Sequence, residues 1–231
     1  MADMNNLPGL EVADIIKALD GVTNGQVDQA GTTMPLIQCI TSGVLRGAAV
    51  RLGTDGSEGR PVAEYEDMIK KLIANDVLVL TIGYPVAIAV DANLVDPSAK
   101  DLAGAGLKRV CELAQIPPVL PLGSLDKIQN VVTIAGAISG DSGLTVPQLP
   151  IVGVDAAAAS AQAVELGNTF LGLGVDVYVG LLPFEGDPMA KAAELGLKNG
   201  ESASFKAETD LGLLADDIIA GLEAKRGALA I

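Results

Sequence analysis

Residues 70–90, KKLIANDVLVLTIGYPVAIAV, contain the clearest fold signal in the chain. Their centre, Val77–Ile82, is short and almost wholly apolar, which is typical of a strand that is buried on both faces of a sheet. Gly83 permits a sharp turn after this strand. Pro85 suits the start of a helix, because the N–H that it lacks has no partner in a first turn. The stretch predicts a buried strand that leads directly into a helix.

The same alternation of short apolar runs with segments of 3.6-residue periodicity continues along the chain. It predicts an α/β fold, Rossmann-like and doubly wound, with a mainly parallel sheet of five to six strands and helices on both faces. The predicted strands are Gly47–Leu52, Val77–Ile82, Val119–Leu122, Pro150–Val154 and Val175–Val179, with Glu201–Phe205 as a possible edge strand. The predicted helices are Ala13–Leu19, Leu36–Ser42, Ala63–Ala74, Pro85–Ala92, Ala99–Leu113, Leu125–Ala137, Ala157–Leu171, Pro188–Leu195 and Leu211–Lys225.

The chain divides into a short extension and one domain. Residues 1–32 are predicted to form an N-terminal helix and loop, because the polar, turn-rich stretch Asn24–Thr33 separates them from the α/β pattern. Residues 33–231 contain no repeat and no linker, and we interpret them as one α/β domain. The N-terminus is acidic and unlike a signal peptide. No apolar run approaches the length of about 18 residues that a membrane helix needs, so we expect no membrane partner.

The composition is apolar and acidic. Hydrophobic residues make up 49% of the chain, its mean hydropathy is +0.42, and charged residues make up 19%. Two interpretations remain open: part of the surface is buried against a protein partner or a second copy, or the core is simply well filled. The net charge of −14 opposes binding to a nucleic-acid backbone, and three Phe, three Tyr and no Trp leave few stacking platforms for single strands.

The chain has no histidine and two cysteines. This count excludes mechanisms that pair a serine or cysteine nucleophile with histidine, and metal sites built on histidine. Cys39 and Cys111 have no metal-ligand spacing, and we predict buried structural thiols in helices. We therefore expect no metal, and a reducing, cytoplasmic location.

A site in a parallel sheet would form where the carboxyl ends of the strands turn into helices. The predicted turns begin at Gly53, Gly83, Gly123 and Gly153. None has the G-x-G-x-x-G pattern of a dinucleotide site, and the chain has no phosphate-binding P-loop motif, so we expect no nucleotide cofactor. The candidate ligand-binding residues in and after these turns are Thr54, Asp55, Tyr84, Ser124, Leu125, Asp126, Lys127 and Asp155.

Several stretches resemble the C-terminal α/β domain of the nickel–iron carbon monoxide dehydrogenases, in the hybrid-cluster/prismane-like family. They cover residues 33–231 in order, and the phrase IPPVL before a Gly-Ser turn and the final KRGALAI are the most specific. The segments are LIQCITSGVLRG (36–47), KKLIANDVLVLTIGY (70–84), AGAGLKRVCELAQIPPVLPLGS (103–124), LPIVGVD (149–155), SAQAVELGNTFLGLGVDVYVGLLPF (160–184) and EAKRGALAI (223–231).

The resemblance implies that three of these turns hold cysteine ligands of a nickel–iron–sulfur cluster in the family. The positions that correspond here are Thr54, Tyr84 and Leu125. A family histidine corresponds to Pro121, and a lysine near the substrate corresponds to Gln162, which we add to the candidate site. Because iron–sulfur clusters need thiolates, the resemblance predicts that this chain holds no such cofactor and does not oxidise CO by itself. The family's upstream helical and middle domains are not found in the sequence, so we expect a stand-alone copy of the last domain.

The substituted residues have two interpretations each. Tyr84 either fills the vacated cluster position, with its hydroxyl bonded to backbone, or contacts a ligand. Asp126 and Lys127 are either an exposed pair at a helix start or an acid/base couple. Asp155 is predicted to cap the following helix. Asp55 belongs to an acidic loop that either is solvated or binds a cation.

Three functions are compatible with these observations. The first is a non-catalytic subunit, whose fold serves as a structural or binding module in a larger metabolic or redox complex of anaerobic metabolism. The second is an enzyme of another class, or a small-ligand carrier, at the carboxyl ends of the strands. The third is an accessory chain that completes a cluster-bearing partner. We favour the first, in which the chain is not an enzyme.

Overall fold

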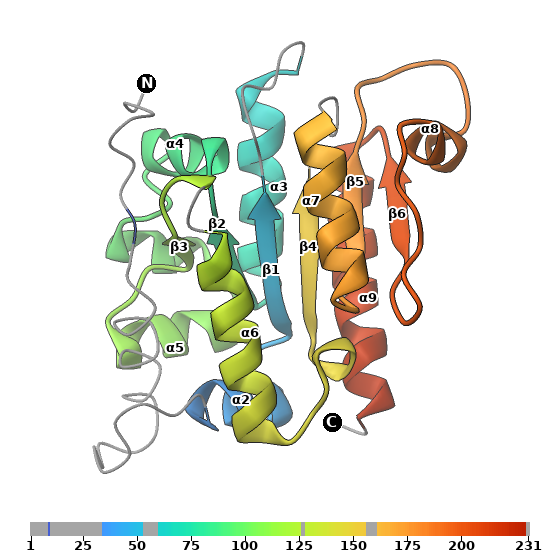
Figure 1. Ribbon diagram of the computed structural model, residues 1–231. Coiled ribbons are helices and arrows are strands. Elements are labelled where there is room, and N and C mark those ends of the chain that lie inside the picture. The colour runs from blue at the N-terminus through green and yellow to red at the C-terminus, as the bar shows by residue number, and fades with distance from the viewer. Residues whose placement is uncertain (1–8, 10–33, 53–59, 126–127, 156–160, 230–231) are drawn as a thin grey trace.

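A sheet of six parallel strands forms the centre of the fold (Figure 1). The computed structural model describes residues 9, 34–52, 60–125, 128–155 and 161–229. The strand order is β3-β2-β1-β4-β5-β6, and each neighbouring pair is parallel. This order is that of a doubly wound Rossmann-type sheet, so the predicted fold class is confirmed. The strands are β1 (Gly47–Leu52), β2 (Val77–Thr81), β3 (Val119–Pro121), β4 (Ile151–Asp155), β5 (Val177–Gly180) and β6 (Phe205–Glu208).

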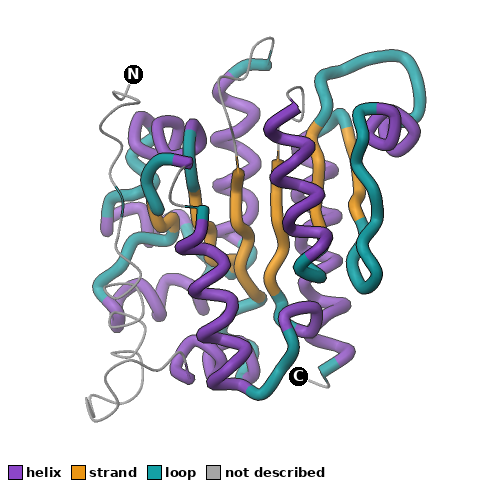
Figure 2. Tube along the Cα trace, in the orientation of Figure 1, coloured by secondary structure: helices purple, strands orange, loops and turns teal. Residues whose placement is uncertain are grey.

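Helices cover both faces of the sheet (Figure 2). In Figure 1, α6 and α7 lie in front of the strands, and α3 and α9 lie behind them. The α-helices are α2 (Met34–Thr41), α3 (Val62–Ala74), α4 (Tyr84–Asp91), α5 (Ala105–Ala114), α6 (Gln129–Ser142), α7 (Ala161–Gly172), α8 (Pro188–Glu194) and α9 (Leu211–Ala228), with short 3-10 helices at Pro97–Leu102 and Val146–Gln148.

The helix α3 shows why these segments fold as they do. Its apolar side chains Met68, Ile69, Leu72 and Ile73 are all buried, whereas Glu64 on another face is exposed. An apolar stripe with this spacing buries one face of a helix against the sheet and leaves the other in water. The predicted stripe is confirmed, and it places the start of α3 beside the carboxyl ends of the strands.

The predicted helix Ala99–Leu113 is wrong, because the segment forms a 3-10 helix and then α5. The break lies at Ala103 and Gly104. The Gly104 N–H donates to the Ile73 carbonyl at 2.9 Å, and the Leu107 N–H donates to Oδ1 of Asp76 at 2.8 Å. A carboxylate that accepts from a backbone N–H stabilises a new helix start, so the end of α3 fixes where α5 begins.

Two other predicted ranges are shifted. The edge strand was expected at Glu201–Phe205 but is Phe205–Glu208, where buried Phe205 and Ala207 alternate with outward-facing Lys206. This alternation, rather than the polar residues before it, marks a half-buried edge strand. The helix expected at Leu125–Ala137 corresponds to α6. This helix begins and ends further along the chain, at Gln129 and Ser142. The predicted helix Ala13–Leu19 lies outside the described residues.

Among the described residues, no helix combines the length and apolar character needed to cross a membrane.

Candidate functional site at the carboxyl edge of the sheet

The central pair of strands, β1 and β4, marks the point where the chain reverses its direction across the sheet. From β1 the chain proceeds to β2 on one side, and from β4 it proceeds to β5 on the other. In open α/β sheets, ligands bind in the crevice outside the carboxyl ends of two such strands. Here β1 and β4 end together, with Leu52 beside Asp155 in the register. The side chains around these two strand ends are therefore the first candidates for a functional site.

Arg51 is the most unusual side chain at this point. It lies in the central strand, is only 3% exposed, and its guanidinium carbon is 4.8 Å from the centre of the Tyr65 ring in α3. Burial lowers the pKa of Arg51 to about 10, and the nearby Tyr65, Asp155 and Tyr84 oppose this shift. Asp155 is itself only 2% exposed. The edge thus contains a buried cation and a buried carboxylate that interact electrostatically.

The hydrogen bonding of Arg51 is incomplete. Its Nε and Nη1 are buried and have no hydrogen-bond partner within the described residues. A buried polar group without a hydrogen bond costs about 1–3 kcal/mol, which the aromatic ring and the carboxylate offset in part. Arg51 is not among the site residues predicted from the sequence. The available signal was a charged residue inside the otherwise apolar run GAAVRL.

The turns after β2 and β3 lie against each other. The Gly83 N–H donates to the Gly123 carbonyl at 2.8 Å. Both glycines have positive φ, 74° and 88°, a region that favours glycine, so the predicted sharp turns are present. Tyr84 and Leu125, which follow these glycines, are partly buried and pack against the core. The structure therefore brings together the turns that contain two of the three positions which the resemblance relates to family cysteines.

The interpretation of the fourth turn is wrong. Gly153 does not turn the chain but lies within β4, where an added Cβ would be 3.1 Å from the ring of Phe170 in α7. Glycine is needed there for close packing of helix on strand. Asp155 was expected at a helix start, but it is the buried last residue of β4, and the described part of the next helix begins at Ala161.

The remaining predicted residues are more peripheral or lie outside the described residues. Ser124 is half-buried in the bend after Gly123, and Pro121 is buried within β3. Gln162 is exposed in the first described turn of α7. Thr54, Asp55, Asp126 and Lys127 lie outside the described residues, so their predicted roles stay predictions.

The two cysteines are buried in helices, as predicted. Cys39 lies in α2 and Cys111 in α5, and both thiols are free. Burial raises the pKa of Cys39, and it raises the pKa of Cys111 to about 11. Both are therefore neutral thiols at ordinary pH, whereas a metal is bound by the thiolate. Within the part of the chain that the structure describes, no group of three or more His, Cys, Asp or Glu side chains could hold a metal ion.

A second buried arginine, Arg60, lies before α3 and was also missed. Its Nη1 donates to Oε2 of Glu64 at 2.7 Å, and its Nη2 donates to the carbonyl of Thr209 at 2.9 Å and to that of Leu181. Leu181 follows β5 and Thr209 follows β6. Arg60 thus joins the start of α3 to the carboxyl ends of the two outer strands, where a cleft of about 510 Å³ opens.

Comparison with known proteins identifies the family. The model of the Prismane/CO dehydrogenase family matches residues 7–211. The chain belongs to this family. Carbon monoxide dehydrogenase 1 from Methanosarcina acetivorans is 33% identical over 225 residues, which is 96% of this chain and 34% of that protein. The beta subunit of a carbon monoxide dehydrogenase/acetyl-CoA synthase from Moorella thermoacetica is 31% identical over 157 residues, or 64% of this chain and 23% of the relative.

Solved structures of the family have the same fold. The carbon monoxide dehydrogenase IV of Carboxydothermus hydrogenoformans superposes with a TM-score of 0.80 at 26% identity, over 96% of this chain and 36% of its own. A nickel-free carbon monoxide dehydrogenase from Thermococcus sp. AM4 gives a TM-score of 0.79 at 28% identity, over 96% and 34% of the two chains. The chain thus spans about a third of the length of the relatives that it matches most fully.

The residues of this chain do not fit an iron–sulfur cluster. Such clusters are held by cysteine thiolates, and the whole sequence has two cysteines and no histidine. Both cysteines are buried in helices rather than in the turns at the carboxyl edge, and their raised pKa values disfavour the thiolate. At that edge, Tyr84 and Leu125 offer a phenol and an alkyl group. The chain has the fold of the part of the family that it matches, and the only thiols in its sequence are those of Cys39 and Cys111.

Proposed function

We propose that this chain is a non-catalytic member of the CO dehydrogenase family that acts as a structural or binding module in a larger, cytoplasmic protein complex. The observation that carries the proposal is the packing of Tyr84 and Leu125 against the core at positions that correspond to cluster ligands in the resemblance. Side chains that fill a site from within stabilise the fold and leave no thiolate for a metal.

The relatives support the proposal of a protein partner. The Moorella thermoacetica relative is a subunit of carbon monoxide dehydrogenase/acetyl-CoA synthase. A structure of nickel-containing iron–sulfur clusters in the alpha subunits of acetyl-CoA synthase/carbon monoxide dehydrogenase superposes with a TM-score of 0.75 at 27% identity, over 93% of this chain and 33% of that one. The low charged fraction of 19% also agrees with a surface that is partly covered in an assembly.

The test is affinity purification of the tagged chain from its native source, followed by size-exclusion chromatography. We expect elution as a complex of defined stoichiometry, well above the mass of 23.4 kDa of one chain. A monodisperse, soluble monomer that carries no other protein would contradict the proposal.

Arg51 favours a second candidate function, a carrier for a small anion at the ends of β1 and β4. Its Nε and Nη1 are buried without hydrogen bonds in the described part of the chain, at the position where ligands enter such sheets. Thermal unfolding in the presence of formate or inorganic phosphate tests this candidate. A carrier is stabilised by the anion, and Arg51→Met abolishes the stabilisation. If neither anion changes the unfolding temperature of the wild type, the first proposal is favoured.

A further inference from the structure

The cleft beside Arg60 lies at the carboxyl edge of the sheet but away from the switch point. It opens between the starts of α3 and α9 and the segments that follow β5 and β6, and its volume is about 510 Å³. The lining combines segments that are far apart in the sequence. For example, Lys71 of α3 donates a hydrogen bond at 2.9 Å to the carbonyl of Gly212 in α9, which is 141 residues away. The lining residues are Arg60, Glu64, Asp67, Met68, Lys71, Pro183, Thr209, Asp210, Leu211 and Gly212.

The two cations of the cleft are already held by the chain. Arg60 is bonded to Glu64 and to two backbone carbonyls, and Lys71 forms an ion pair with Asp216 at 2.7 Å. Asp67 is exposed, and no ion pair between described residues includes it. Asp210 is exposed and caps α9 by accepting hydrogen bonds from the Gly212 and Leu213 N–H groups, and no ion pair between described residues includes it. The charge that the cleft offers to another molecule is therefore negative.

Exposed apolar side chains are adjacent in the sequence to residues that line the cleft. Val62 follows Arg60 by two residues, Leu182 and Phe184 flank the lining residue Pro183, and Leu213 follows Gly212. Leu213 is 55% exposed, the largest value among the exposed large apolar side chains of the described residues. Apolar groups around a charged pocket exclude water from a side chain that is inserted into it, which is the arrangement found at binding hot spots.

We propose that this cleft docks a partner protein through a segment that presents a lysine or arginine between apolar residues. The proposal rests on the proposed function and names the chemistry of its partner. The basic side chain enters the cleft and pairs with Asp67 and Asp210. The apolar neighbours of the basic residue then cover Leu213 and Phe184. A long cationic side chain that inserts into a pocket with an apolar surround is a frequent anchor of protein interfaces.

Charge argues against a second copy of this chain as the occupant. Each copy contains 29 acidic and 15 basic residues, for a net charge of −14, so two copies repel each other at long range. A basic partner is attracted instead, and its association is accelerated at low salt.

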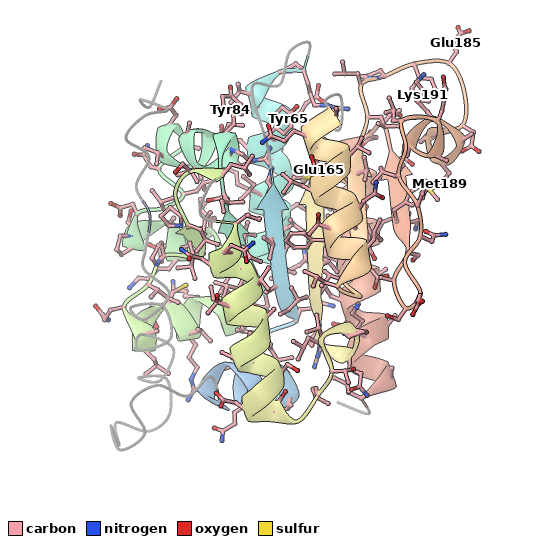
Figure 3. All side chains as sticks on the ribbon, viewed as in Figure 1. Tyr65, Tyr84, Glu165, Glu185, Met189 and Lys191 are labelled. Atoms are coloured by element: carbon pink, nitrogen blue, oxygen red, sulfur yellow. The ribbon has the colours of Figure 1, made fainter. Side chains whose placement is uncertain are left out.

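The experiment begins with the complex isolated through the full tagged chain. A carbodiimide, which joins a carboxylate directly to an amine, is applied, and the linked peptides are identified by mass spectrometry. The affinity of the purified partner is then measured for the wild type and for Asp67→Lys and Leu213→Asp. The matched controls are Glu165→Lys, labelled in Figure 3, and Leu173→Asp, which change exposed residues in and just after α7. This helix lies on the face of the sheet opposite to α3 and α9 (Figure 1). Circular dichroism checks that each variant is folded.

We expect cross-links from Glu64, Asp67 or Asp210 to partner lysines. Each cleft variant should weaken binding of the partner about tenfold. Asp67→Lys should also make the affinity for the partner less dependent on salt concentration. The control variants should stay within about twofold of the wild type. A partner that binds both cleft variants normally and is cross-linked elsewhere overturns the docking site but leaves the proposed function intact. If the chain forms a complex only with itself, the proposal of a basic partner is wrong. If it forms no complex at all, both the docking site and the proposed function are wrong.

Discussion

The two halves of the carboxyl edge differ in how they use buried charge. At the ends of β1, β2 and β3, Tyr84 and Leu125 pack against the core, and Arg51 is buried with incomplete hydrogen bonding. At the ends of β5 and β6, Arg60 is equally buried, and its Nε also has no hydrogen-bond partner among the described residues. Its Nη1 and Nη2, however, are bonded to a carboxylate and two carbonyls, and a cleft opens beside it. One half is filled by the chain's own side chains, and the other is held in shape by an arginine. The packed half therefore suits a structural role, and the cleft half suits recognition.

The largest expected effect is at Arg60. Arg60→Met leaves the buried Leu181 carbonyl and the Thr209 carbonyl without their donor. A buried acceptor that is left without its partner costs about 1–3 kcal/mol, so we expect the free energy of unfolding in urea to fall by about 2–4 kcal/mol. Arg46→Met is the control, because it breaks a partly exposed pair with Glu223 and one part-buried hydrogen bond to the Asn75 carbonyl, and it should cost about 1 kcal/mol. Equal losses in the two variants would contradict the role assigned to Arg60.

The second effect depends on pH and concerns the buried thiol of Cys111 in α5. The pKa of Cys111 is raised from 9.0 to about 11 in the folded protein. The folded state therefore holds this proton more tightly, so stability is complete below about pH 9 and falls as pH rises toward 11, by at most about 2 kcal/mol. Urea unfolding from about pH 8 upward measures the slope. Cys111→Ala removes this contribution, and an unchanged slope in the variant would show that the thiol is not responsible.

A smaller effect is expected at Tyr84. Its ring is partly buried against the core, so Tyr84→Ala should cost about 1–2 kcal/mol, less than a fully buried aromatic side chain. Tyr84→Phe keeps the ring and should stay within about 0.5 kcal/mol. If the two variants are equally destabilised, the hydroxyl rather than the ring stabilises this half. Thermal or urea unfolding distinguishes the cases.

The smallest effect is expected at Arg51, in contrast to Arg60. Arg51→Met removes the contact with the Tyr65 ring and takes the nearby cation away from the buried Asp155 carboxylate, but it also removes the burial of Nε and Nη1. These contributions oppose each other, and we expect a net change of less than about 1 kcal/mol. A loss as large as that of Arg60→Met would show that Arg51 is fully partnered, and the contrast between the halves would fail.

The sequence was sufficient to predict the elements that depend on local pattern. The strand Gly47–Leu52 has its predicted bounds, because a short apolar run ended by glycine is a local signal. The turns at Gly83 and Gly123 were predicted for the same reason. The break before α5 was not, because it depends on Asp76, which lies 31 residues from its partner Leu107 in the sequence.

The site was predicted less completely than the fold. Tyr84 and Leu125 were found because glycine turns mark the ends of strands. Arg51 was visible as a charge in an apolar strand, but its burial depends on the packing of α3. The cleft could not be predicted, since Arg60 and Thr209 are 149 residues apart and only the folded sheet brings them together.

The central claim is that the packed half of the edge holds no cluster. The most direct measurement is the iron and nickel content of the chain, purified anaerobically and separated from any partner, together with its visible absorption spectrum. We expect less than one atom of either metal per chain and no iron–sulfur absorption. Stoichiometric iron and nickel that remain with the separated chain would contradict it.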